Sequence, residues 1–257
     1  MTLATRLRSP DAEERVAAIA ELSTRRRAEP EELAALADCL GHPRKAVQRP
    51  AAEAFAALAR GGVRVDDVLE AALDAGEARG RWGAAFALSL VGELPARAVP
   101  VVLQTLGAAD GDLRWAAAAI VARLRGRAGL VEALAELVRG DNAAQRKMAL
   151  YCLRDLDARS PGVEEMVVHA LGDVDRDVQL AAITTLARLS TDRAGGAARL
   201  LRFLDGGDVR LRRAAAAGLG LLGERSEPVL AALRRARGGD DDSLRRAAEG
   251  ALRLLGG

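Results

Sequence analysis

The sequence has few of the residues from which catalytic and metal sites are commonly built. Its 257 residues include two histidines, His42 and His169, and two cysteines, Cys39 and Cys152. No cluster of Cys and His has the spacing of a metal site. With only two histidines to act as a base, no Ser/His/Asp catalytic triad can be assembled from the sequence. We therefore expect a protein that is not an enzyme and that holds no metal or cofactor.

Long apolar runs and an excess of one charge are also missing. The N-terminal segment MTLATRLRSPDAEER lacks the apolar core of a signal peptide, and no uncharged run of about 18 residues could span a membrane. Lys and Arg number 38 against 36 Asp and Glu, which gives a formal net charge of +2. We expect no membrane contact, and this balance does not indicate an obligate binder of polyanions.

A repeat of about 33 residues organises the chain instead. Its clearest copy is Asp208–Gly223, DVRLRRAAAAGLGLLG, in which we take Leu211 as the reference position. Equivalent reference positions recur every 32 or 33 residues, at Val47, Gly80, Leu113, Gln145, Val178, Leu211 and Leu244. Apolar residues recur four, eight and eleven positions after each reference, and these offsets share one face of an α-helix.

The position four residues after the reference holds alanine in every copy. These alanines are Ala51, Ala84, Ala117, Ala149, Ala182, Ala215 and Ala248. Because aromatic residues make up only 2% of the chain, Ala and Leu must do most of the filling of its core. We expect the alanines to lie where helices approach too closely for a larger side chain.

Each repeat also has an apolar pattern before the reference, which predicts two helices per repeat. The position eleven residues before the reference holds Leu36, Leu69, Val102, Leu134, Val167, Leu200 and Leu233. We call the two helices of a repeat first and second. The predicted repeats span residues 30–59, 65–91, 95–124, 128–156, 160–190, 193–222 and 226–255, after two helices over 2–8 and 11–24. Pro50 is expected to kink its second helix or to delay the helix start to about Arg49.

Residues 1–257 are therefore expected to form a single repeat array. Residues 1–29 fit the pattern poorly and are expected to be a degenerate N-terminal cap repeat, followed by six regular repeats over 30–223 and a C-terminal cap repeat over 224–257. In the last repeat Arg237 replaces an apolar residue of the first helix, which predicts a hairpin that faces water on one side.

The copies DVRLRRAAAAGLGLLG and DDDSLRRAAEGALRLLG resemble the HEAT-repeat family, particularly its bacterial phycobilin-lyase-type branch. The resemblance covers about residues 30–257. It implies an all-α fold, a right-handed α-solenoid of about eight HEAT-like helical hairpins, whose second helices line a concave groove.

In that family a turn Asp and a following Arg form a ladder between neighbouring repeats. The matching arginines here are Arg81, Arg114, Arg146, Arg212 and Arg245, with Gln48 and Gln179 departing from the pattern. We assign this row to structure, because Asp208 and Arg212 have the i, i+4 spacing of an ion pair within one helix.

The cysteines lie in the second and fifth repeats. Stacked helices are about 8–10 Å apart, so Cys39 and Cys152 are expected to lie well beyond the roughly 7 Å between Cα atoms that a disulfide tolerates. Two unpaired thiols favour a reducing compartment. We therefore expect a cytoplasmic protein.

One column of the repeat points away from the predicted core. The position two residues after the reference holds Arg49, Trp82, Trp115, Lys147, Leu180, Arg213 and Arg246, and at about 100° per residue it lies roughly 200° from the core stripe. Tyr151 and Arg154 fall near the same face. The predicted partner-binding residues are Arg49, Trp82, Trp115, Lys147, Tyr151, Arg154, Arg213 and Arg246. An alternative stays open, in which each tryptophan lies flat on small neighbours and fills space.

These side chains favour a non-catalytic scaffold or adaptor that binds another protein or a peptide in the concave groove, since Trp, Tyr and Arg dominate protein interfaces. An alternative is a nucleic-acid backbone binder, with bases on the rings and phosphates on the cations. The almost neutral chain favours the protein partner. The resemblance adds a third alternative, a subunit of a phycobilin-lyase-like protein that handles tetrapyrroles.

Overall fold

The computed structural model describes residues 1–206 and 208–256, with the side chain of Ala75 excepted. Helices joined by turns and short loops make up this part of the chain. The all-α prediction is confirmed. The helices are α1 (Leu3–Leu7), α2 (Ala12–Ser23), α3 (Pro30–Leu40), α4 (Lys45–Arg60), α5 (Asp66–Ala75), α6 (Ala78–Val91), the 3-10 helix η1 (Ala96–Ala98), α7 (Val99–Thr105), α8 (Gly111–Arg123), α9 (Leu130–Arg139), α10 (Ala143–Asp155), α11 (Pro161–Ala170), α12 (Arg176–Leu189), α13 (Arg193–Leu204), α14 (Val209–Leu222), α15 (Glu227–Arg237) and α16 (Asp242–Leu254).

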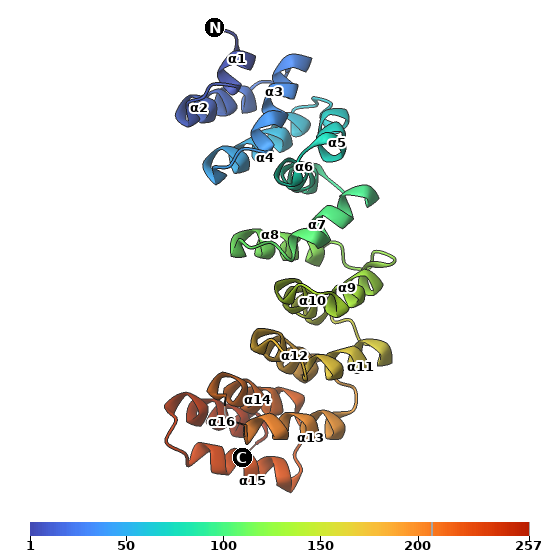
Figure 1. Cartoon of the computed structure of the whole chain (residues 1–257), viewed down its shortest axis with the longest axis vertical. Coiled ribbons are helices and arrows are strands. Elements are labelled where there is room, and N and C mark those ends of the chain that lie inside the picture. Colours follow the sequence, from blue (N-terminus) through green and yellow to red (C-terminus); the bar gives the residue numbers. More distant parts are fainter. Residues whose placement is uncertain (207, 257) are drawn as a thin grey trace. The chain divides into compact units, whose positions relative to one another are not determined.

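The helices follow one another as first and second helices of successive hairpins, as an α-solenoid requires (Figure 1). The chain divides into two compact units, an N-terminal unit of Met1–Thr105 and a C-terminal unit of Leu106–Gly257. Within the N-terminal unit the second helices α2, α4 and α6 pack in order. Within the C-terminal unit α8, α10, α12, α14 and α16 do the same.

Side-chain caps start most of the second helices. The cap row, three residues before the reference, accepts backbone N–H bonds at Asp110, Asn142, Asp175, Asp208 and Asp241. Asp208, for example, accepts from the amides of Arg210 and Leu211 at 2.8 and 3.2 Å. These bonds satisfy amides that have no partner within the helix, and the negative charge suits the helix N-terminus.

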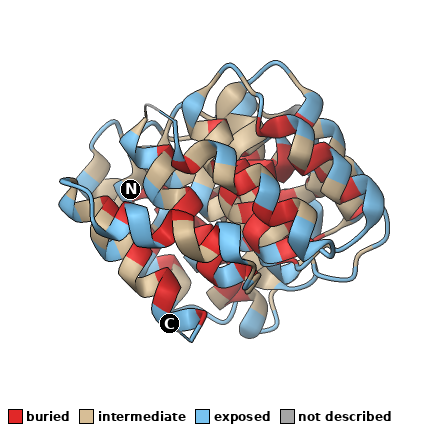
Figure 2. Ribbon diagram, turned by 90° about the horizontal axis from the view of Figure 1, so that it is seen from below, coloured by how far each residue is buried: buried red, intermediate tan, exposed pale blue. Residues whose placement is uncertain are grey.

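The core follows the predicted columns. All seven alanines of the repeat have no exposed surface, and the seven apolar residues of the first helices are buried as well. In Figure 2 the buried residues lie on the inner sides of the helices and the exposed residues on the outer sides. Arg237 is exposed, as its position in the last first helix predicts.

Two glycines mark the closest helix contacts. A Cβ at Gly83 of α6 would lie 2.3 Å from the Leu40 carbonyl oxygen at the end of α3. A Cβ at Gly220 of α14 would lie 2.6 Å from the Cα of Ala251 in α16. Backbones therefore meet at these points at a distance that only glycine permits.

Pro50 does not delay the start of its helix, so that part of the expectation is wrong, while the kink stays a prediction. The helix α4 begins at Lys45 and continues through Pro50 to Arg60. Proline deprives the Ala46 carbonyl of its helical donor, but Ala46 is exposed, so water can replace that bond.

The row of Arg and Gln residues is structural, but the predicted pairing of Asp208 with Arg212 is wrong. Arg212 donates to the carbonyl of Leu204, where the first helix of its own hairpin ends, while Asp208 pairs with Arg176 of the preceding repeat at 2.7 Å. The same kind of bond, from the second helix to carbonyls at the end of the first helix or in the turn after it, is made by Gln48, Arg114, Arg146 and Gln179. These carbonyls have no partner within their helix, and an amide N–H serves them as well as a guanidinium does.

Gly83 offers a sharp test of this packing because Gly80, in the same helix, has no heavy atom within 4 Å of an added Cβ. We expect Gly80→Ala to stabilise the protein by up to ~1 kcal/mol through helix propensity. Gly83→Ala should destabilise it by roughly 1–3 kcal/mol, because the methyl group overlaps the Leu40 backbone. Chemical denaturation of both variants checks this, and equal effects would contradict the close contact of α6 with α3.

Candidate functional site

The predicted contact residues divide between the two units. Arg49 and Trp82 belong to the N-terminal unit, on α4 and α6. The other six belong to the C-terminal unit, on α8, α10, α14 and α16. They are Trp115, Lys147, Tyr151, Arg154, Arg213 and Arg246. Each set is therefore described within its own unit.

In the N-terminal unit, Arg49 is exposed but Trp82 is not. The indole of Trp82 is only 5% exposed and stacks on Phe86, one turn later in α6, with ring centroids 5.7 Å apart. The expectation that Trp82 faces solvent is wrong, and the packing alternative applies to it. A ring at i and a ring at i+4 share one face of a helix, so each covers the other.

In the C-terminal unit, Trp115 is 58% exposed and stacks on Tyr151 of the neighbouring second helix. The ring centroids are 6.2 Å apart and the ring planes are inclined by only 11°. The guanidinium carbon of Arg154 lies 4.8 Å from the Tyr151 ring centroid, within the range of a cation–π contact. We call Trp115, Tyr151 and Arg154 the aromatic platform.

The Tyr151 side chain is half-buried, and burial raises the pKa of its phenol above the ordinary value. The hydroxyl therefore stays protonated at neutral pH. A protonated phenol both donates and accepts hydrogen bonds, so the platform offers a polar group at the edge of an apolar surface.

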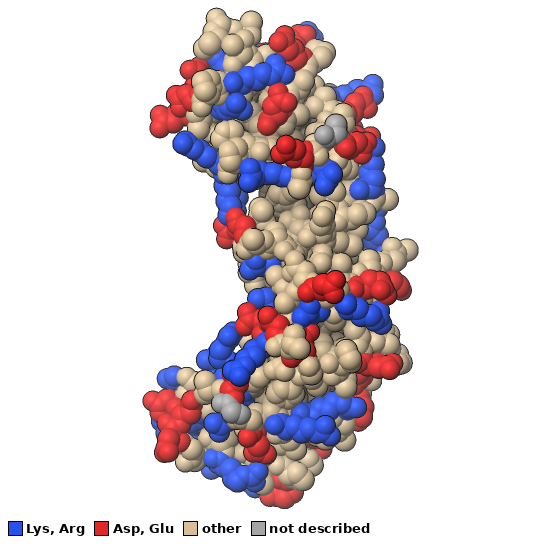
Figure 3. Space-filling model, in the orientation of Figure 1, with Lys and Arg blue, Asp and Glu red and all other residues tan. Residues whose placement is uncertain are grey.

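Beside the platform, a chain of ion pairs crosses three second helices. The Nζ of Lys147 lies 3.1 Å from one oxygen of Asp177, and Arg210 lies 3.0 Å from the other. Hydrogen bonds, first from Lys147, lower the pKa of the Asp177 carboxyl. Sequence reasoning selected Lys147 but missed Asp177 and Arg210, which occupy the position just before the reference. Figure 3 shows cations and acids interleaved on the surface that it presents.

Further along, Arg213 on α14 and Arg246 on α16 are exposed, and neither forms an ion pair with a carboxylate in the described part of the chain. The same two helices expose Leu221 (67%) and Leu254 (61%), which the sequence analysis missed. The sequence could have predicted their exposure, because both leucines stand ten residues after the reference in consecutive repeats, at a position outside the core columns.

A family model of HEAT repeats matches residues 163–253. This part of the chain is similar to HEAT repeats. The match covers most of α11, all of α12 to α15 and most of α16, and it includes Arg213, Leu221 and Arg246. No curated protein matches the sequence.

Solved structures share the fold along more of the chain. CpcE and CpcF of phycocyanin lyase from Nostoc sp. PCC7120 give a TM-score of 0.54 at 18% identity, over 62% of this chain and 99% of that chain. Kap95p, from a structure that concerns its binding to RanGDP, gives a TM-score of 0.66 at 15% identity over 98% of this chain. The aligned part is only 40% of the Kap95p chain. The Escherichia coli protein YibA gives 0.62 at 17% identity over 99% of this chain and 91% of that chain. At such identities the similarity shows the HEAT-like fold alone.

The remaining chemistry is sparse. Cys39 and Cys152 are buried free thiols, as their positions in distant repeats predict, and burial raises the pKa of Cys152 to about 12, so this thiol is protonated and inert. Across residues 1–206 and 208–256 no three His, Cys, Asp or Glu side chains are placed to share a metal ion. In the same residues no helix has the length and apolar character to cross a membrane.

The two tryptophans should respond differently to truncation. Trp82→Ala removes a buried ring and is expected to destabilise the protein by roughly 3–5 kcal/mol. Trp115→Ala removes a mostly exposed ring and should change stability by less than about 1 kcal/mol. Chemical denaturation followed by circular dichroism measures both. Equal losses would show that Trp115 is a packing residue like Trp82.

Proposed function

We propose that the chain is a non-catalytic scaffold or adaptor that binds a partner protein or peptide on the second helices of its C-terminal unit. The observation that carries the proposal is the aromatic platform, in which a tryptophan is 58% exposed and yet held in place by a stacked tyrosine. An exposed large ring that is already ordered loses little side-chain entropy on binding.

The residue types of the platform support a protein partner. Trp, Tyr and Arg are the side chains that most often dominate the affinity of protein interfaces. Here an apolar centre, Trp115, adjoins a cation at Arg154 and the paired charges of Lys147 and Asp177. An apolar anchor with a polar margin is the usual composition of such an interface. Arg49 stays a proposed contact residue of the N-terminal unit, and buried Trp82 is left out.

Charge argues against the nucleic-acid alternative. On and beside the aromatic platform, Lys147 and Arg210 share Asp177 and Arg154 is paired with Asp155, so the cations that would meet phosphates there already have carboxylate partners. Binding of a nucleic-acid backbone depends on cations that are free to replace counterions. The likeness to the phycocyanin lyase subunits supports the fold, and the proposal does not extend that activity to this chain.

The proposal is tested with a partner captured from an extract of the source cells and identified by mass spectrometry. Isothermal titration with the purified partner then compares the wild type with Trp115→Ala and with the control Val174→Ala, which removes a 97% exposed side chain between α11 and α12. We expect Trp115→Ala to weaken binding by at least ~2 kcal/mol, and Val174→Ala to leave it unchanged. Equal affinities for both variants would contradict the proposal.

A salt titration separates the two partner classes. A protein partner anchored on Trp115 should lose little affinity between low and physiological salt, whereas a nucleic-acid complex loses affinity steeply. A labelled single-stranded oligonucleotide serves as the second probe. If it binds with a steep salt dependence and requires Trp115, the nucleic-acid alternative replaces the scaffold proposal.

A further inference from the structure

The helices α14 and α16 expose two leucines beside two arginines that form no ion pair in residues 1–206 and 208–256. Leu221 and Leu254, equivalent residues of consecutive repeats, expose 67% and 61% of their surface. Arg213 and Arg246 stand eight residues before them on the same helices, which is about 12 Å along a helix axis. The aromatic platform lies on other helices, α8 and α10, so this is a separate surface.

The contact at Gly220 brings α14 and α16 together near Leu254. Because Gly220 has no side chain, α14 approaches α16 until an added Cβ would lie 2.6 Å from the Cα of Ala251. The Cδ1 of Leu254 lies 3.3 Å from the same Cβ position. Leu221 and Leu254 therefore occupy equivalent positions on two helices that are in direct contact.

Small residues lie between the leucines and the arginines. Ala217 is four residues from both Arg213 and Leu221, and Gly250 is four residues from both Arg246 and Leu254. At about 100° per residue, each arginine and each leucine lies about 40° to either side of its small residue. The leucines thus form one row and the arginines another, with small residues between them, and we call this surface the α14–α16 trough.

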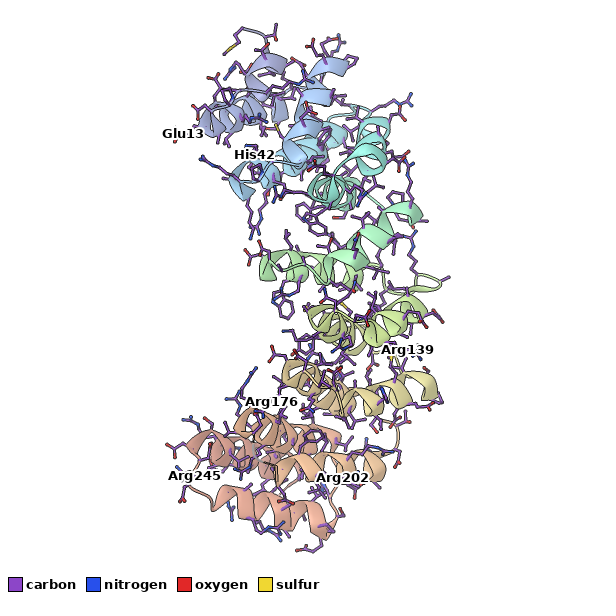
Figure 4. The ribbon with its side chains drawn as sticks, in the orientation of Figure 1. Glu13, His42, Arg139, Arg176, Arg202 and Arg245 are labelled. Atoms are coloured by element: carbon purple, nitrogen blue, oxygen red, sulfur yellow. The ribbon has the colours of Figure 1, made fainter. Side chains whose placement is uncertain are left out.

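The cations of the trough are not neutralised by the acids nearby. Asp242 is bonded to Arg245, Asp208 to Arg176, and Asp177 to Lys147 and Arg210. Glu249, three residues after Arg246, forms no ion pair in the described residues. Figure 4 labels Arg245 near the start of α16 and Arg202 on α13. Two arginines that form no ion pair in the described residues, beside two exposed leucines, fit an occupant that is apolar on one side and acidic on the other.

The spacing of the trough selects an α-helix as the occupant. Packed helices such as α14 and α16 are about 8–10 Å apart, and a helix that crosses them covers this distance in about five to seven residues. At seven residues, two turns return a side chain to the same face. An extended strand covers the same distance in about two or three residues, and at three residues its second side chain points to the opposite face.

We propose that the α14–α16 trough binds an amphipathic acidic α-helix of a partner protein, with apolar side chains every seven residues on Leu221 and Leu254 and carboxylates with the same spacing on Arg213 and Arg246. This inference rests on the proposed function, because it too assigns protein binding to the second helices of the C-terminal unit. It names the class of partner segment and a second surface for it.

The probe is a fluorescein-labelled synthetic helix of about three heptads with Leu and Glu at heptad spacing, measured by fluorescence anisotropy on the full chain. The control peptide has the same composition in scrambled order. We expect the double variant Leu221→Ser with Leu254→Ser, and the double variant Arg213→Glu with Arg246→Glu, each to weaken binding at least about tenfold. The matched control, Arg202→Glu with Arg235→Glu, makes the same charge change at exposed, equivalent positions of α13 and α15 and should bind as the wild type does.

A charge reversal keeps the test decisive. A peptide with Lys in place of Glu should bind the Arg213→Glu, Arg246→Glu variant and not the wild type. Equal binding of the scrambled peptide, or the same loss in the α13–α15 control, would overturn the proposal. So would a wild-type dimer in sedimentation velocity that the leucine variant dissociates, because the trough would then bind a second copy. Trp115→Ala should leave the peptide affinity unchanged, so a failure here is distinct from a failure at the aromatic platform.

Discussion

Close stacking of the second helices is the constraint on which the rest of the structure depends. The seven alanines of the repeat are completely buried, and at Gly220 the backbones of α14 and α16 meet with no side chain between them. Small residues at these contacts bring neighbouring helices near enough for side chains on adjacent repeats to touch. The stacking of Trp115 on Tyr151 and the sharing of Asp177 by Lys147 and Arg210 both follow from that spacing.

The sequence predicts this frame well because the frame is periodic. A buried column must repeat wherever a helix meets its neighbour, so the alanine and leucine columns identify the helices to within a few residues. The Arg and Gln row was harder to interpret, since i, i+4 spacing suggests a pair within one helix. Carbonyls at the end of the first helix or in the turn after it accept these bonds instead, because no helical amide reaches them, and Arg146 also forms an ion pair with Asp173 of the next repeat.

The outward-facing column is where periodicity stops being informative. Trp82 and Trp115 occupy the same position of the repeat, yet one is 5% exposed and the other 58%. Position in the repeat sets the direction in which a side chain leaves its helix, whereas burial depends on what surrounds it, and Trp82 has Phe86 one turn away where Trp115 has Ala119. The cations of that column differ in whether they form an ion pair, because pairing depends on what the neighbouring repeat presents. Lys147 is paired with Asp177, whereas Arg213 forms no ion pair in the described residues.

The central claim is that Trp115 forms a surface platform while Trp82 is part of the core, and the chain's two tryptophans allow a direct measurement. Trp82→Phe leaves Trp115 as the only indole, and Trp115→Phe leaves Trp82. Acrylamide quenching of the two variants reports the solvent access of each ring. The account predicts strong quenching and red-shifted emission for Trp115, and weak quenching with blue-shifted emission for Trp82. Equal quenching of the two, or stronger quenching of Trp82, would contradict it.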